Sequence, residues 1–262
     1  MPGPCRNLLA LTVLAALAGC TGDAPTLVST AGDATTGALA GPATPDMPGY
    51  NPFSDQPPAA IGRREVIQTP TLAEVLQTGE LPEMALGRKD APVTIIKYAS
   101  MTCPYCRKFQ LETFPVLKRE YIDTGKVRFI IREFPIGHQS GLATIALRCA
   151  APDKYFALYD KLMREQPSWV SQEVRPDPIF KVAQGVGMTR AQFDTCRQNR
   201  GMIAQLNWVK ERGRTLGVIG TPNFFVQGRL VKSVIGMPEI RAMVDPIVVG
   251  RVAASDGQPK AR

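Results

Sequence analysis

The hydrophobic pattern of the chain predicts strands at both ends of a folded region. Apolar, β-branched runs at Val93–Ser100 and Val127–Phe134 predict two strands, separated by a segment of helical composition at Arg107–Asp123. Strand, helix and strand in this order imply parallel pairing. Two further strand-like runs, Gly220–Val226 and Arg229–Ser233, meet at a Gln-Gly pair, which favours a hairpin.

Helical patterns fill the interval between these two pairs of strands. The predicted helices are Gly141–Ala151, Lys154–Arg164, Pro178–Gly185, a short one that begins near Thr189, and Met202–Leu216. A last helix is predicted from Pro238 to Val249, and Pro115 predicts a kink in the segment after the first strand. The order therefore predicts an α/β fold with an all-helical insertion at about 138–216.

The N-terminal part of the chain has a different composition. Residues 1–20 carry one charge, Arg6, and a short apolar core, which predicts an export signal. Its end resembles a bacterial lipobox, which would make Cys20 a lipidated residue; the alternative is ordinary cleavage nearby. Residues 21–60 are rich in Pro, Gly, Ala, Thr and Ser and predict a disordered linker.

The remaining boundaries follow from the pattern. We expect a partly ordered extension at 61–86, a folded domain at 87–250 and a polar tail at 251–262. A chain of 262 residues with 44% hydrophobic content is long enough for one such domain with appendages. The formal net charge of +8 comes from dispersed lysines and arginines, so we expect a solvated basic surface and no nucleic-acid partner.

The cysteines divide by position. Of the six in the chain, Cys5 lies in the predicted signal and Cys20 at its end. An even set of four remains, consisting of Cys103, Cys106, Cys149 and Cys196. Adjacency favours pairing the first two and leaves the last two for a structural disulfide in the insertion, although two buried free thiols are an alternative. That bond would close a loop of about 46 residues and stabilise the fold by at most roughly 4 kcal/mol.

The motif Cys103-Pro104-Tyr105-Cys106 lies at a strand-to-helix junction. Pro104 suits the first helical turn, which places Cys103 at the helix cap and Cys106 one turn deeper. The helix N-terminus favours a thiolate at Cys103, and the two residues between the cysteines tune that effect. We therefore predict that, in disulfide exchange, Cys103 is the sulfur that an incoming thiolate attacks and Cys106 is the resolving partner.

Three other interpretations of the pair are open. A structural zinc site would need two more ligands, and the sequence offers His138, expected in the turn before the inserted helices, and two widely spaced cysteines. The pair could also form a static disulfide. A copper-binding module would use the two cysteines with Met101 beside them. We favour redox activity and predict no metal.

Together with the helical insertion, Cys103-Pro-Tyr-Cys106 and Thr221-Pro222 give the chain a specific resemblance. From about Leu86 to Val249 it resembles the DsbA-like family of exported thiol-disulfide oxidoreductases, in particular the alphaproteobacterial type with a second cysteine pair. The resemblance implies a thioredoxin fold. It also implies a cis proline at Pro222 beside the cysteines, with Thr221 offering its backbone to an extended client.

The resemblance implies an activity as well. The expected function is donation of the Cys103–Cys106 disulfide to reduced exported proteins in the bacterial periplasm, with recycling by a quinone-linked membrane oxidase and no cofactor beyond the disulfide. An isomerase or reductase of the same fold is the alternative. Lys97 departs from the family pattern, since many relatives carry an acidic residue there, and strand direction alone does not show whether it points to the pair.

Overall fold

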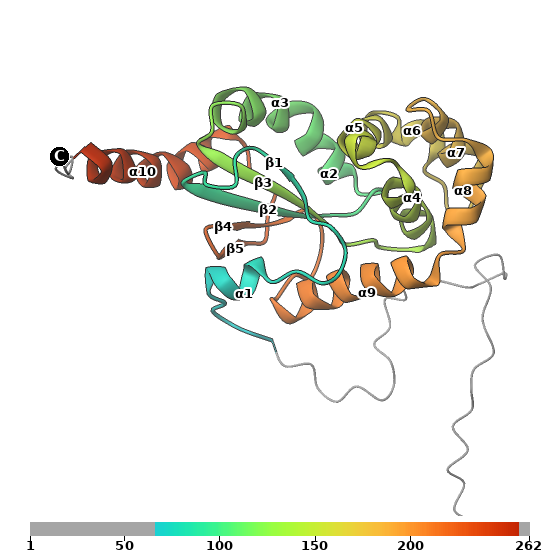
Figure 1. Ribbon diagram of the computed structural model, residues 1–262, viewed down its shortest axis with the longest axis horizontal. Helices are drawn as coiled ribbons and strands as arrows, with labels where there is room; N and C mark the ends of the chain where they lie inside the picture. The colour runs from blue at the N-terminus through green and yellow to red at the C-terminus, as the bar shows by residue number, and fades with distance from the viewer. Residues whose placement is uncertain (1–65, 257–262) are drawn as a thin grey trace, which may run out of the picture. The chain divides into compact units, whose positions relative to one another are not determined.

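The structure is a computed structural model that describes residues 66–256, with side chains up to Arg251 (Figure 1). The predicted export signal, the lipidation candidate Cys20 and the predicted linker lie outside the described residues. Within the described part, no helix combines the length and apolarity needed to cross a membrane.

A five-stranded sheet of order β1-β3-β2-β4-β5 forms the centre of the fold. Its strands are β1 (Met84–Leu86), β2 (Val93–Ala99), β3 (Val127–Glu133), β4 (Asn223–Val226) and β5 (Arg229–Val231). The predicted parallel pairing of β2 with β3 is confirmed, and β4 pairs antiparallel with both β2 and β5. Gln227 and Gly228, with φ of 48° and 84°, make the predicted hairpin turn, which requires left-handed backbone.

Strand β1 was not predicted. It pairs antiparallel with β3, so the segment 61–86, expected to be an extension outside the folded domain, contributes an edge strand to the sheet. Three residues are too few to show strand periodicity. Helix α1 (Leu72–Leu76) in the same segment begins with a capping box between Thr71 and Glu74.

All the helices predicted in the insertion are present. They are α4 (His138–Cys149), α5 (Tyr155–Arg164), α7 (Pro176–Gln184), α8 (Arg190–Arg197) and α9 (Arg200–Thr215), with the short η3 (Pro152–Lys154) and α6 (Gln166–Trp169) in addition. The last helix, α10 (Met237–Asp256), continues past the predicted end, so the segment expected to be a tail begins inside a helix. The residues from Arg251 to Asp256 include no glycine or proline that would stop it.

The segment after the cysteine motif is helical, as predicted, but it is not one regular helix. It runs as α2 (Pro104–Lys108), η1 (Phe109–Thr113), α3 (Phe114–Leu117) and η2 (Lys118–Ile122), in which η1 and η2 are π-helical turns. The first π turn ends two residues before Pro115, whose ring and missing N–H disturb regular α-helical bonding. The disturbance expected near Pro115 thus takes the form of a π turn.

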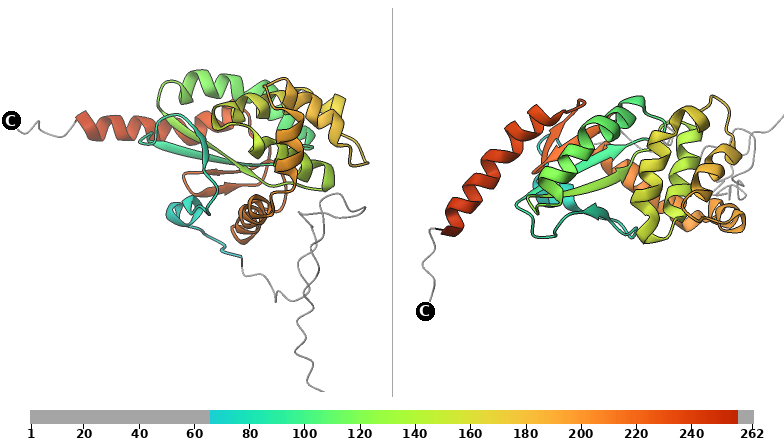
Figure 2. Two further views of the ribbon diagram at one scale, coloured as in Figure 1. Left: turned by 45° about the vertical axis from the view of Figure 1, so that its right-hand side comes forward. Right: turned by 90° about the horizontal axis from the view of Figure 1, so that it is seen from above.

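Both faces of the sheet are covered, which explains why its central strands are almost continuously apolar. On one face, Ile95 and Ala99 pack with the helices that follow the motif and with α10; on the other, Ile96 and Tyr98 pack with α1 and the end of α9. Helices α4–α8 gather at the end of the sheet away from the C-terminus of α10 (Figure 2). The cysteine motif lies where β2 meets this helical group.

Candidate active site

The cysteine pair occupies the loop from β2 into α2 in the predicted arrangement. Cys103 is the N-cap residue, with extended backbone at φ −74° and ψ 120°, and Pro104 is the first helical residue. Cys103 is half-buried, whereas the Cys106 side chain is fully buried. Both are free thiols in this structure. The two sulfurs therefore differ in access, and only Cys103 can be approached from solvent.

The surroundings stabilise a thiolate at Cys103. Its pKa is lowered from 9.0 to about 5, first by a hydrogen bond from the Cys106 thiol, with further contributions from the Thr221 side chain and the backbone N–H groups of Cys106 and Tyr105. Burial opposes this shift but does not outweigh it. The pKa of Cys106 is raised well above 9.0, mainly by burial. The reduced pair thus consists of a thiolate at the surface and a thiol below it.

This difference predicts a titration. In the reduced protein, the ultraviolet absorbance of one thiolate should appear with a midpoint at about pH 5, and Cys103→Ser should lack that step. Because the folded pKa lies below the unfolded value, the thiolate stabilises the reduced fold fully above about pH 9, and this stabilisation is lost as the pH falls through about 5. A midpoint near that of an ordinary thiol would contradict the prediction.

Thr221 and Pro222 lie beside the pair, and their peptide bond is cis. When it is protonated, Cys103 donates a hydrogen bond to the Thr221 carbonyl, with 3.1 Å between sulfur and oxygen. The Thr221 hydroxyl has no other hydrogen-bond partner in the described part of the chain, so it is free to donate to the thiolate. The structure therefore brings together all the residues that the sequence analysis assigned to the redox site.

Two residues of the insertion hold the active-site loop, and the sequence analysis missed both. The Gln166 side chain donates to the carbonyls of Met101 (2.7 Å) and Cys103 (3.1 Å). The Ser140 hydroxyl accepts from the Met101 N–H (3.1 Å) and bonds the Ser100 hydroxyl (2.7 Å). Polar side chains in helices carry no sequence signal for contacts this distant in the chain. Through them the insertion fixes the position of the cysteine pair.

Lys97 points from β2 into the core beneath the pair. Its side chain is fully buried, and its Nζ lies 3.1 Å from the Tyr159 hydroxyl and 3.4 Å from the Cys106 carbonyl oxygen. The Phe109 ring lies 4.4 Å from the same nitrogen. Burial lowers the pKa of Lys97 to about 8, although interaction with Cys106 and Cys103 opposes that shift. The residue that departs from the family pattern is thus part of the site.

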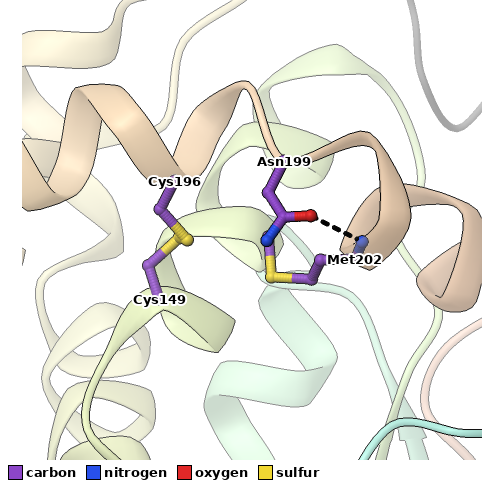
Figure 3. Close-up of a disulfide and its surroundings, with 4 residues drawn as sticks. All are labelled: Cys149, Cys196, Asn199 and Met202. Atoms are coloured by element: carbon purple, nitrogen blue, oxygen red, sulfur yellow. Dashed lines mark hydrogen bonds between the residues drawn. A yellow bond between two sulfur atoms is a disulfide. The ribbon is translucent and has the colours of Figure 1, made fainter.

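The second cysteine pair forms the disulfide predicted from the sequence. Cys149, the last residue of α4, is joined to Cys196 of α8, with 5.8 Å between the two Cα atoms (Figure 3). Next to it, the Asn199 side chain accepts from the Met202 N–H and caps α9. The bond ties two helices of the insertion together at a distance in sequence of 47 residues.

The residues considered for metal binding besides the cysteines are His138 and Met101. His138 is the first residue of α4, after Gly137 at the cap, and Met101 is buried in the core. Between residues 66 and 251, the side chains of His, Cys, Asp and Glu form no group of three or more that could hold a metal ion.

Fold and site together define a protein of the thioredoxin-fold class, with a Cys-x-x-Cys pair beside a cis proline. A family model described as Thioredoxin matches residues 80–246. The chain belongs to this family.

Individual relatives agree with this assignment. The chain is 30% identical over 173 residues to a protein of Rickettsia bellii named as a protein-disulfide oxidoreductase, covering 63% of this chain and 66% of that one. It is 25% identical to "Disulfide bond formation protein D" of Bacillus subtilis, covering 63% and 77%. The Rickettsia conorii relative is covered to 53%, so the chain spans between half and two thirds of the length of these Rickettsia proteins.

A solved structure shows the same fold. The crystal structure of Wolbachia pipientis alpha-DsbA1 superposes with a TM-score of 0.63 at 22% identity, covering 69% of this chain and 98% of that one. At this level of identity the match bears on the fold alone. It places the thioredoxin sheet and the helical insertion in one known architecture.

Proposed function

We propose that this protein is a thiol-disulfide oxidoreductase that donates the Cys103–Cys106 disulfide to exported proteins. The observation that carries the proposal is the contrast between an accessible cysteine that is stabilised as a thiolate and a fully buried cysteine one helical turn below it. This contrast assigns different roles to the two sulfurs in disulfide exchange. Only Cys103 can be attacked by a client thiolate, and Cys103 is also the better leaving group.

The exchange proceeds in two steps. A client thiolate attacks the Cys103 sulfur of the oxidised pair; the Cys103–Cys106 bond breaks, and Cys106 leaves and takes up a proton. A second client thiolate then attacks the client sulfur of the mixed disulfide. The low pKa of Cys103 makes it a good leaving group in this step. The client has lost two electrons and two protons as its disulfide forms, and the protein is left reduced.

The surface around the pair supports binding of an extended, partly apolar client. Thr221 presents backbone next to the Cys103 sulfur. Three large apolar or aromatic side chains near the site are exposed, namely Tyr105 in the motif, Ile219 two residues before Thr221, and Ile136, whose N–H donates to Ser100. Reduced chains that have not yet folded expose apolar segments of this kind.

A pair of measurements tests the proposal. Oxidised protein mixed with a reduced client should form one client disulfide for each pair reduced, and the equilibrium potential of the pair against glutathione should lie toward the oxidising end of the known range. A strongly reducing potential would exclude the donor role. It would favour the alternative, a reductase or isomerase, which Thr221 before the cis proline and the Pro104-Tyr105 dipeptide also suit.

The cellular setting forms part of the proposal. We place the protein in the bacterial periplasm, where disulfides persist, with its recycling by a quinone-linked membrane oxidase and with the disulfide as its only redox group. Lipidation of Cys20 would anchor the chain, and residues 21–60 would let the folded domain reach clients away from the membrane. The mass of the mature N-terminus tests the anchor, because an unmodified chain that starts elsewhere would exclude it.

A further inference from the structure

A buried positive charge lies beneath the cysteine pair without a negatively charged side chain beside it. The contacts of the Lys97 ammonium are the Tyr159 hydroxyl, the Cys106 carbonyl and the face of the Phe109 ring, all of them neutral. No Asp or Glu of the described chain lies within ion-pair distance of Lys97. A fully buried ammonium is strongly disfavoured unless a compensating charge is near.

Of the described groups packed around Lys97, only the two redox sulfurs can supply a compensating negative charge. The neighbouring strands place Ile131 and Phe224 in register with it, and both are apolar. Helix α10 contributes buried apolar residues to this face of the sheet. Tyr159 comes from α5, and the two redox sulfurs come from α2 and its cap.

The nearest carboxylates are engaged elsewhere. Glu133 and Asp160 act on the Tyr159 hydroxyl and not directly on Lys97. Glu133 is bound by Arg148 and Asp160 by Arg164. The groups whose charge can balance the Lys97 ammonium are therefore the sulfurs of Cys103 and Cys106, and they carry negative charge only when the pair is reduced or in exchange.

We propose that Lys97 is a positioning residue of the redox pair, whose amine takes up one proton when the disulfide is reduced and, as the resulting ammonium, stabilises the reduced state. This inference rests on the proposed function. A client dithiol gives up two electrons and two protons as it becomes a disulfide. The pair accepts both electrons; one proton goes to the Cys106 sulfur, Cys103 stays a thiolate, and the second proton goes to the Lys97 amine.

The titration behaviour of Lys97 agrees with this role. Burial lowers its pKa to about 8, and interaction with Cys106 and Cys103 is what opposes a larger fall. In the oxidised protein the pair carries no charge, so the pKa of Lys97 must be lower still. At a pH between the Lys97 pKa of the oxidised protein and that of the reduced protein, Lys97 is neutral when the cysteine pair is oxidised and charged when the pair is reduced.

The test is the reduction potential of wild type and Lys97→Met, measured against glutathione from about pH 6 to about pH 9. Each proton taken up with the two electrons makes the potential of the pair about 30 mV more negative per pH unit, which corresponds to a tenfold change in the equilibrium constant for its reduction. Below about pH 8, reduction of the wild-type pair should take up more than one proton, whereas reduction of the pair in Lys97→Met should take up one. At neutral pH the variant should be less oxidising than wild type. The equilibrium constant for reduction of its pair should be lower by about tenfold for each pH unit by which reduction raises the pKa of Lys97 in wild type.

Three matched variants separate charge from structure. Lys97→Gln keeps a polar group near Tyr159 without the charge and should behave like Lys97→Met, which also covers the case in which Lys97→Met does not fold. Tyr159→Phe keeps the ammonium and should retain the wild-type pH slope. Lys210→Met removes another buried lysine, which lies 5.8 Å from the Phe134 ring in the cluster on the other face of the sheet, and should leave the slope unchanged.

The outcomes distinguish this inference from the proposed function. If wild type oxidises the client and Lys97→Met keeps both its potential and its pH slope, the role of Lys97 is excluded and the donor function stands. An equal shift in Lys97→Met and Lys210→Met would also exclude it, because the effect would then be general to buried lysines. If wild type does not oxidise the client at all, the donor function itself is excluded, whatever the slope.

Discussion

Replacing Cys103 with serine will abolish disulfide donation to a reduced client. Serine fits the same N-cap position, but it cannot form the disulfide that the client attacks. The rate of client oxidation should fall by more than about 100-fold, to that of the reaction without protein. The measurement is the loss of client thiols with time, using oxidised wild type as reference.

The matched variant is Cys106→Ser. It keeps the Cys103 thiolate but removes the resolving sulfur. Mixed with an oxidised client, its Cys103 thiolate should attack the client disulfide, release one client thiol and remain in a mixed disulfide, visible as a covalent complex on a non-reducing gel. If Cys103→Ser formed that complex in place of Cys106→Ser, the two roles would be reversed. If Cys103→Ser oxidised the client at the wild-type rate, the site would lie elsewhere in the chain.

The sequence could predict the parts of the site that depend on local chain geometry. The difference between Cys103 and Cys106 follows from Pro104, which fixes where the helix begins, and from the turn that separates the two sulfurs. The Thr221-Pro222 segment could be assigned only through the family resemblance, because Gly-Thr-Pro by itself is an ordinary turn.

The remaining features depend on contacts between distant segments. Alternation along β2 places Lys97 on the face of Ile95, but it does not say which helices cover that face. Gln166 and Ser140 hold the active-site loop through bonds across 65 and 39 residues of sequence, and nothing in their own neighbourhoods marks them. Strand β1 likewise depends on β3 and has no periodicity of its own.

These contacts give the helical insertion a role in the site. The position of the cysteine loop depends on how firmly the insertion is held against the sheet. A buried charged group makes that connection, because Glu133 at the end of β3 accepts hydrogen bonds from Arg148 of α4 (2.8 Å) and from the Tyr155 hydroxyl of α5 (2.8 Å). Arg148 also donates to the Pro82 carbonyl (2.7 Å), which joins the segment before β1 to the same group.

Replacing Arg148 with methionine should therefore lower the free energy of unfolding by about 3–5 kcal/mol, since it leaves the Glu133 carboxylate buried without its cation. The side chains of Glu133 and Arg148 are 0% and 7% exposed, so solvent cannot replace the lost partner. The measurement is urea unfolding of the oxidised protein. Lys161→Met is the control, because its pair with Glu165 is partly exposed and should contribute only about 0–1 kcal/mol.

The double variant Glu133→Gln with Arg148→Met identifies the cause of the loss. Removing both charges relieves the unpaired carboxylate, and the glutamine can still accept from Tyr155, so the double variant should be more stable than Arg148→Met alone. The single variant Glu133→Gln is measured as well. If the double variant lost as much stability as the two single variants together, the effect of Arg148 would come from packing and from its bond to Pro82. Recovery of stability in the double variant would instead show that a buried ion pair holds the insertion, and with it the cysteine loop, against the sheet.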